Sequence, residues 1–173
     1  REVLPFYTDE SDFILDVDAL VKFAKVSKAS AICLVNPCNP TGFALPKDKM
    51  IRLLDSIGQI GIVVDETYID YIGKGNSIES CVEQYPNLMV LKSVSKFYAL
   101  SGMRIGYAVA AVSVAKQFQI ETPPYIVSTP GQMAAIAAFE AEDYYLDRVE
   151  ETHRLREGFS GKLRSLPGLR VMP

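Results

Sequence analysis

The sequence predicts an α/β fold in which helices flank a mostly parallel sheet. Three short, continuous apolar runs, at residues 31–35, 61–64 and 88–91, have the composition of strands that are covered on both faces. Apolar residues with helical spacing occur over residues 16–27 and 46–58, so helices alternate with these runs. Strands and helices that alternate in this way form βαβ units, with parallel strands and right-handed crossovers.

Before the first apolar run, the chain is predicted to form a short strand and one helix. Residues 3–7 are compatible with a short strand, and Asp16 or Asp18 can cap the helix that follows. The inner face of this helix carries Leu20, Phe23, Ala24 and Ser27. After the first run, two Asn-Pro steps and a glycine within residues 36–42 predict a turn.

The second helix and the later elements follow from the same patterns. Pro46 suits the first turn of a helix and Gly58 suits its end. Between them, apolar residues recur at i, i+3, i+4 and i+7, namely at Met50, Leu53, Leu54 and Ile57. Beyond the second run we expect, in order, a loop, a short helix at 78–84, the third run, a fourth strand at 105–112, an irregular linker at Pro123 and Pro124, and helical segments over 132–141 and 146–166.

Composition and charge exclude several classes of function. The 173 residues are 49% hydrophobic and 23% charged, as in an ordinary globular protein. The net charge of −3 gives no sign of the excess of basic residues that nucleic-acid binding requires. No apolar stretch reaches the ~20 residues of a membrane span, and the N-terminus lacks the pattern of a signal peptide. Cys33, Cys38 and Cys81 are odd in number and lack Cys-x-x-Cys spacing, which favours the cytoplasm. His153 is the only histidine, so a histidine metal cluster or a histidine-based triad is excluded.

Polar residues follow each of the three apolar runs. Asn36 and Asn39 come after the first, Asp65 after the second, and the stretch from Ser93 to Lys96 after the third. Ligands of parallel α/β sheets bind beyond the carboxyl ends of the strands, which are about 5 Å apart when they are neighbours. Taken alone, the stretch from Ser93 to Lys96 is also compatible with a surface loop. The expected convergence of polar residues from three strand ends favours a binding site instead.

The residues at these strand ends suit one kind of ligand. Arg104 can bind a phosphate through two hydrogen bonds, with help from the hydroxyls of Ser93 and Ser95. Lys96 offers an amine, and Asp65 is expected to be a buried carboxylate that needs a positive partner. Pyridoxal 5′-phosphate carries a phosphate, an aldehyde and a basic ring nitrogen, and would satisfy all of these groups.

Three motifs in this region resemble those of one enzyme family. Residues 36–42 resemble an Asn-Pro-x-Asn-Pro-Thr-Gly turn, residues 65–68 an Asp-Glu-x-Tyr motif, and residues 93–96 together with Arg104 a lysine segment. Their order and spacing, over about residues 31–110, are similar to those of the class I/II aminotransferases. This family of pyridoxal-phosphate enzymes has the aspartate-aminotransferase fold, also called fold type I.

The resemblance implies a role for each matched residue. Lys96 would be the catalytic residue, which forms a Schiff base with the cofactor and later moves a proton. Asp65 would keep the ring nitrogen of the cofactor protonated. Asn39 and Tyr68 would hydrogen-bond the 3′-oxygen of the ring, and the Asn39–Pro40 bond would be cis.

The remaining matched residues would bind the phosphate group of the cofactor. These are Ser93, Ser95 and Arg104. Glu66, which follows the acidic residue of the second motif, is expected to support the loop rather than to touch the cofactor. Three nearby tyrosines are expected to be packing residues, namely Tyr71, Tyr98 and Tyr107.

The resemblance also implies how the chain is divided. Residues 1–145 would be the central part of the cofactor-binding large domain, and residues 146–173 would form a long helix and the start of the C-terminal small domain. The chain begins on a possible strand and stops just after a turn, so we expect a fragment of a larger enzyme that is a homodimer at full length. The substrate-carboxylate arginine, a glycine-rich phosphate loop and a ring-stacking aromatic would lie outside it. The isolated chain is therefore expected to bind the cofactor poorly and to be inactive.

Within the family, residues 65–71, 96–104 and 123–128 are similar to two kinds of enzyme. A histidinol-phosphate aminotransferase would move an amino group from an amino acid or a phosphorylated amine to a 2-oxo acid. A threonine-phosphate decarboxylase of cobalamin synthesis would use the same cofactor to release carbon dioxide. A non-catalytic sensor domain of a transcription regulator is a third hypothesis, and the aminotransferase is favoured.

Overall fold

The computed structural model describes residues 2–172, and the chain falls into two compact units. The first unit comprises Arg1–Ser93 and Gly106–Ile126, and the second comprises Val94–Ile105 and Val127–Pro173. The chain therefore leaves the first unit after Ser93, returns at Gly106, and leaves it again after Ile126. The predicted boundary between large and small domains at residue 145 stays a prediction.

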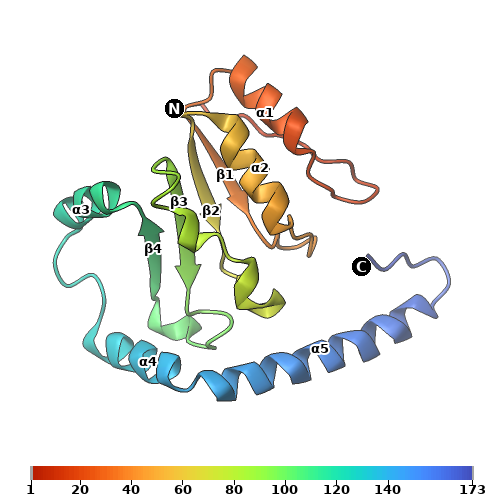
Figure 1. The fold of residues 1–173 in the computed structure, drawn as a ribbon. Coiled ribbons are helices and arrows are strands. Elements are labelled where there is room, and N and C mark those ends of the chain that lie inside the picture. Colours follow the sequence, from red (N-terminus) through yellow and green to blue (C-terminus); the bar gives the residue numbers. More distant parts are fainter. Residues whose placement is uncertain (1, 173) are drawn as a thin grey trace. The chain divides into compact units, whose positions relative to one another are not determined.

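The first unit is built on a four-stranded sheet with the strand order β1-β2-β3-β4 (Figure 1). The strands are β1 (Ala31–Val35), β2 (Gly61–Asp65), β3 (Leu88–Ser93) and β4 (Gly106–Ala110). β1, β2 and β3 are parallel, and β4 runs antiparallel to β3. The predicted α/β fold with a mostly parallel sheet is confirmed.

Two helices pack on the sheet and form most of the core of this unit. In α1 (Val17–Val26), the side chain of Asp16 accepts a hydrogen bond from the N–H of Ala19 (3.0 Å) and so caps the first turn. α2 (Lys47–Ile57) ends at Gly58, whose φ of +72° favours glycine. The buried side chains of both helices meet those of the strands in one cluster, which includes Leu20, Ala24, Ile32, Met50, Leu53, Leu54, Ile57, Ile62, Val64, Leu88 and Val90.

Three expectations for the first unit are wrong in detail. Residues 3–7 form no strand; they are mostly exposed, and Pro5 has no N–H to offer a neighbouring strand. The helix expected at 78–84 is a single 3₁₀ turn, Glu79–Cys81, because Pro86 and the approach to β3 stop its extension. β4 is shorter than expected, since α3 (Val112–Glu121) already begins two residues after it.

One face of β1 is exposed, although the continuous apolar run predicted burial on both faces. Cys33 is exposed and Val35 has 46% of its surface accessible, whereas Ile32 is buried. β1 is one of the two edge strands of the sheet, and α1 and α2 pack against the face that carries Ile32. Alternate residues of β1 therefore stay accessible in this chain.

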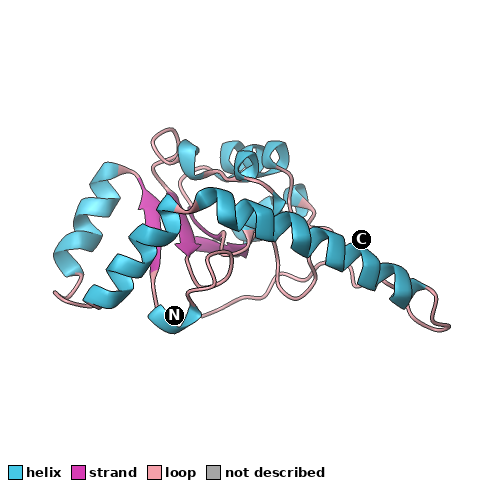
Figure 2. Cartoon of the chain, turned by 90° about the horizontal axis from the view of Figure 1, so that it is seen from below, coloured by secondary structure: helices cyan, strands magenta, loops and turns pink. Residues whose placement is uncertain are grey.

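The second unit consists of the loop Val94–Ile105 and two helices, α4 (Thr129–Glu140) and α5 (Glu142–Arg164). The hydroxyl of Ser128 accepts the N–H of Gly131 (3.2 Å) at the start of α4. Figure 2 shows α5 as a long, unbroken helix. The helical character predicted for this part of the sequence is confirmed. Among residues 2–172, no helix combines the length and the apolar character that crossing a membrane requires.

Candidate functional site

The carboxyl ends of β1, β2 and β3 lie side by side, and together they are called the carboxyl edge below. Val35, Asp65 and Leu91 are direct partners across the three strands. The N–H of Asn36 donates to the carbonyl oxygen of Asp65 (2.9 Å), and the N–H of Glu66 donates to that of Leu91 (2.9 Å). The ladder thus continues one residue past β1 and β2, and it fixes where the polar residues emerge.

The turn after β1 is held in shape by a buried asparagine. The side chain of Asn36 binds the backbone of Leu45 twice, since its Oδ1 accepts the N–H (2.7 Å) and its Nδ2 donates to the carbonyl oxygen (3.2 Å). The N–H of Gly42 donates to the carbonyl oxygen of Cys38 (2.8 Å) and closes the turn. The Asn39–Pro40 bond is cis, as expected, and the Asn36–Pro37 bond is cis as well. Asn39 is thereby presented at the surface of a fixed turn.

Asn39 and Tyr68 come from different motifs and meet at the carboxyl edge. The side-chain Nδ2 of Asn39 donates to the hydroxyl oxygen of Tyr68 (2.9 Å). Tyr68 is held by the 3₁₀ turn that follows it, Ile69–Ile72, because Ile69 is fully buried and its N–H donates to the carbonyl oxygen of Glu66 (3.0 Å). An amide and a phenol, both hydrogen-bond donors, are therefore brought together.

Asp65 ends β2, and it is half-buried rather than buried as expected. Because the strand ends here, the side chain lies at the margin of the core, where a neighbouring hydroxyl can donate a hydrogen bond to one carboxylate oxygen. Its Oδ1 accepts hydrogen bonds from the N–H (2.9 Å) and the hydroxyl (2.5 Å) of Thr67. Within the part of the chain that the structure describes, Oδ2 accepts no hydrogen bond. One carboxylate oxygen is thus fixed, and the other can accept a donor from a ligand.

Ser93 is the last residue of β3 and pairs with Gly106 on β4. A Cβ atom added to Gly106 would lie 2.8 Å from the carbonyl oxygen of Lys92. This is closer than real Cβ contacts come, so the end of β3 needs glycine opposite it. The close approach of the two strands fixes the position of Ser93 opposite Gly106.

The other predicted site residues, Ser95, Lys96 and Arg104, belong to the second unit. Their loop is closed at its base, where the N–H of Val94 donates to the carbonyl oxygen of Ile105 (3.3 Å). Lys96 is exposed.

Arg104 has a left-handed backbone conformation, with φ 55° and ψ 46°. Its Nη1 donates to the carbonyl oxygen of Ser101 (2.8 Å). Its other N–H groups make no hydrogen bond to the residues that the structure describes. A guanidinium group that is anchored at one nitrogen keeps donors for an anion.

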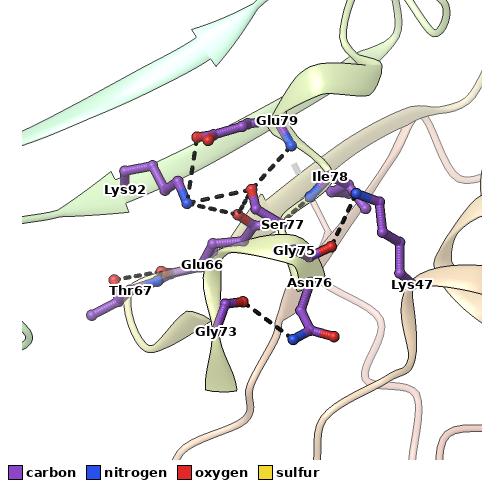
Figure 3. Close-up of polar contacts among 11 residues, drawn as sticks. Lys47, Glu66, Thr67, Gly73, Gly75, Asn76, Ser77, Ile78, Glu79 and Lys92 are labelled. Carbon is purple, nitrogen blue, oxygen red and sulfur yellow. Dashed lines mark hydrogen bonds and ion pairs between the residues drawn. The ribbon is translucent and has the colours of Figure 1, made fainter. Parts of the chain in front are cut away.

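Glu66 and Lys92 form a buried ion pair directly behind the carboxyl edge (Figure 3). The side chain of Glu66 is fully buried and that of Lys92 is 6% exposed, and their Oε2 and Nζ atoms lie 3.1 Å apart. The Nζ of Lys92 also lies 3.4 Å from the hydroxyl oxygen of Ser77 and 3.4 Å from Oε2 of Glu79. Glu66 further accepts the hydroxyl of Ser77 (2.6 Å) and the N–H of Ile78 (3.0 Å). Glu66 therefore supports the loop, as expected.

Lys92 was not predicted, although the sequence contains a signal for it. Leu88, Val90 and Lys92 alternate along β3, so the lysine shares the buried face of the strand. Burial alone would lower the pKa of Lys92, but the nearby carboxylates of Glu66, Asp70 and Glu79 outweigh it and raise this pKa above its ordinary value. A lysine in register with buried residues requires an acidic partner, and Glu66 is that partner.

The three tyrosines expected to be packing residues differ in their surroundings. In the second unit, Tyr98 packs edge-on against Phe139 and Tyr145, with ring centroids 5.1 Å apart in both pairs. In the first unit, burial raises the pKa of Tyr71 and of Tyr107. Tyr107 pairs with Lys92 across β3 and β4, yet 45% of its surface is accessible, so it is only partly packed.

A cavity of about 610 Å³ lies beside the edge strand β1, and it is lined by that strand, the N-terminal segment and residues of α1. Most of its lining is apolar, and none of the seven predicted site residues contributes to it. The hydrogen-bonded groups at the carboxyl edge, rather than this cavity, are therefore the candidate functional site.

Comparisons with known proteins agree with this fold and these motifs. The family model for aminotransferase class I and II matches residues 2–173. A histidinol-phosphate aminotransferase from Thermoanaerobacter sp. (strain X514) is 30% identical over 162 residues, which cover 94% of this chain and 45% of that protein.

Two solved structures are similar in fold and sequence. The crystal structure of histidinol-phosphate aminotransferase from Sinorhizobium meliloti in complex with pyridoxal-5′-phosphate has a TM-score of 0.83 at 25% identity, over 91% of this chain and 43% of that one. L-threonine-O-3-phosphate decarboxylase from Porphyromonas gingivalis has a TM-score of 0.74 at 26% identity, over 82% and 43%. The chain spans less than half the length of these relatives.

Proposed function

The chain belongs to the aminotransferase class I and II family, and on this basis we propose that the intact protein is a pyridoxal 5′-phosphate-dependent aminotransferase. The seven residues predicted from the motifs would hold the cofactor. Four of them, Asn39, Asp65, Tyr68 and Ser93, lie in the first unit, and the other three lie in the second.

The groups at the carboxyl edge fit the ring of this cofactor. Oδ2 of Asp65 can accept a hydrogen bond from a protonated ring nitrogen, while Thr67 holds Oδ1. The carboxylate would stabilise the positive charge of that nitrogen. Asn39 and Tyr68 offer an amide N–H and a phenol O–H to a single ring oxygen that carries negative charge. Each group therefore has the chemistry that its part of the ring requires.

In the second unit, the amine of Lys96 would hold the aldehyde of the cofactor and would later move a proton at the substrate α-carbon. The guanidinium of Arg104 and the hydroxyl of Ser95 would bind the phosphate, as their motif predicts. When bound, pyridoxal phosphate supplies an electron sink for negative charge at the substrate α-carbon. The protein would contribute placement, charge balance and proton transfer.

The observation that carries the proposal is the hydrogen bond between Asn39 and Tyr68. It joins two motifs that are 29 residues apart in the sequence, and it places two donors at the edge of the sheet where ligands of parallel α/β folds bind.

The substrate that best agrees with the relatives is a phosphorylated amine such as histidinol phosphate, with a 2-oxo acid as amino-group acceptor. A threonine-phosphate decarboxylase is the second candidate, because the Porphyromonas gingivalis decarboxylase shares the fold of this chain. A homodimer and a cytoplasmic location stay predictions from the sequence.

The two candidates are separated by their products. The intact protein is incubated with pyridoxal 5′-phosphate and either histidinol phosphate plus 2-oxoglutarate, or phosphothreonine. We expect glutamate to form in the first mixture. Carbon dioxide from the second mixture, without glutamate from the first, would identify the decarboxylase, and no product from either would contradict both proposals.

A further inference from the structure

We propose that the buried Glu66–Lys92 pair positions Asp65 for the ring nitrogen of the cofactor. This inference rests on the proposed function, because it gives the ion pair a task in cofactor binding and not only in folding. All the contacts that carry it lie within the first unit.

Glu66 is the middle residue of the turn in which Asp65 is fixed. The side chain of Asp65 reaches across it to the N–H and hydroxyl of Thr67. The backbone of Glu66 is held on both sides, since its N–H donates to the carbonyl oxygen of Leu91 (2.9 Å) and its carbonyl oxygen accepts the N–H of Ile69 (3.0 Å). Any movement of Glu66 would therefore move the carboxylate of Asp65.

The side chain of Glu66 anchors this turn from behind the sheet. Residues 65 and 66 are adjacent at the end of an extended strand, so their side chains leave on opposite faces. Asp65 is half-buried at the carboxyl edge, whereas Glu66 is fully buried and bound by Lys92, Ser77 and Ile78. Figure 3 shows the amine of Lys92 pointing toward the carboxylates of Glu66 and Glu79 and the hydroxyl of Ser77.

Lys92 links this anchor to the next strand. It lies on β3, one residue before Ser93, which is itself a proposed phosphate contact. The ion pair thus joins the residue after Asp65 to the residue before Ser93, across neighbouring parallel strands. A hydrophobic pair would fill the same space, but it would not fix the orientation of the two strand ends as charged hydrogen bonds do.

The first test measures the affinity of the intact protein for pyridoxal 5′-phosphate by absorbance titration. We expect Lys92→Met to weaken binding about 10-fold, because groups in one polar network couple strongly. Arg52→Met is the matched control, because it also removes a cation from an ion pair, the one with Asp18. This pair is exposed, since the side chain of Arg52 is 52% accessible and that of Asp18 is 68% accessible. The control should change the affinity less than about twofold.

The second test asks whether Lys92 acts through Asp65. In a double-mutant cycle, Asp65→Asn weakens cofactor binding by itself, and Lys92→Met should then add less than about twofold. A general loss of structure would instead make the two effects multiply. Multiplying effects would overturn the proposal.

The third test is spectroscopic and does not depend on turnover. If Asp65 is displaced, it stabilises a positive ring nitrogen less well, and the ring then withdraws fewer electrons. The absorbance of the bound cofactor changes with pH, and we expect the midpoint of this change to lie at higher pH in Lys92→Met. Lys92→Arg keeps the charge, and it should restore the wild-type titration. An unchanged titration in Lys92→Met would contradict a positioning role.

A variant that folds poorly would not leave the question open. Lys92→Met combined with Glu66→Gln removes both charges, so that no unpaired charge stays buried, and the amide oxygen of the glutamine can still accept a hydrogen bond from Ser77 or Ile78. The unfolding midpoint of each variant is measured beside the affinity. A double variant as stable as the wild type but weaker in cofactor binding supports the proposal, and one that binds like the wild type overturns it.

The same experiments separate this inference from the proposed function. Failure of the wild-type protein to bind pyridoxal 5′-phosphate would refute the proposed function itself. If the wild type binds the cofactor and Lys92→Met binds it equally well, only the positioning role is refuted.

Discussion

At the scale of single residues, Asp65 and Glu66 illustrate how position on a strand decides the task of a carboxylate. Asp65 keeps one oxygen available at the carboxyl edge, while Glu66 is fully buried against Lys92. Asn36 and Asn39 divide in the same way, since Asn36 is buried and Asn39 is exposed. The functional group alone, a carboxylate in one pair and an amide in the other, does not distinguish the members, but burial and partners do.

The two asparagines should therefore give opposite results when each is changed to alanine. Asn36→Ala leaves the N–H and the carbonyl oxygen of Leu45 without their buried partners, and should lower the free energy of unfolding by about 2–4 kcal/mol. Asn39→Ala removes one exposed hydrogen bond and should cost less than about 1 kcal/mol, but it should weaken cofactor binding. Denaturant unfolding and cofactor titration of both variants check this. Equal losses of stability would contradict the division of roles.

At the scale of elements, the pairing of β3 with β4 depends on a residue without a side chain. The space opposite Gly106 is closed by the backbone of Lys92, which cannot move aside as a flexible side chain would. We expect Gly106→Ala to lower the free energy of unfolding by about 1–3 kcal/mol through this overlap. Gly102→Ala is the control, because nothing lies within 4 Å of the Cβ position there. Similar unfolding midpoints for the two variants would show that the strands tolerate a Cβ.

The link between β2 and β3 should also be visible in the pH dependence of stability. The pKa of Lys92 is raised above its ordinary value of 10.5, so the folded state binds the proton more tightly than the unfolded state does. This contribution is complete below pH 10.5 and is lost as the pH rises through the higher folded value. The raised pKa values of Tyr71 and Tyr107, from 10.0, act in the same direction.

Arginine at position 92 tests this dependence, because its side chain keeps its charge at high pH. We expect the unfolding temperature of the wild type to fall more steeply above pH 10.5 than that of Lys92→Arg. Tyr71 contributes equally to both proteins and cancels in the comparison. A positive charge at position 92 lowers the pKa of Tyr107, and because arginine keeps that charge at high pH, Tyr107 makes the curve of Lys92→Arg flatter still. Parallel curves would mean that the ion pair contributes nothing to alkaline stability.

At the scale of the whole molecule, the sequence predicts the sheet well because apolar runs and turn residues are local signals. The run at residues 61–64 and the helix that carries Leu53 both lie where they were expected. The exposed face of β1 was not predictable, since burial depends on what packs against a strand and not on its composition. The gathering of polar residues at the carboxyl edge was predictable from the order of the strands, because βαβ connections constrain that order strongly.

The buried network shows where such prediction ends. Lys92 follows the alternation of buried residues along β3, which can be seen in the sequence. Its partners Ser77 and Glu79 come from a segment whose sequence has no regular pattern. Only the folded chain brings them within hydrogen-bonding distance of Glu66. Inactivity of the isolated 173-residue chain stays a prediction, and so do the roles of the seven site residues.

The most direct test of the account asks which lysine holds the cofactor. The intact protein is loaded with pyridoxal 5′-phosphate, reduced with borohydride to make the lysine–cofactor link permanent, and digested for peptide mass analysis. We predict one labelled residue, the exposed Lys96, and no label on Lys92, whose amine is held by Glu66. Label on another lysine, or unchanged labelling of a Lys96→Ala variant, would contradict the account.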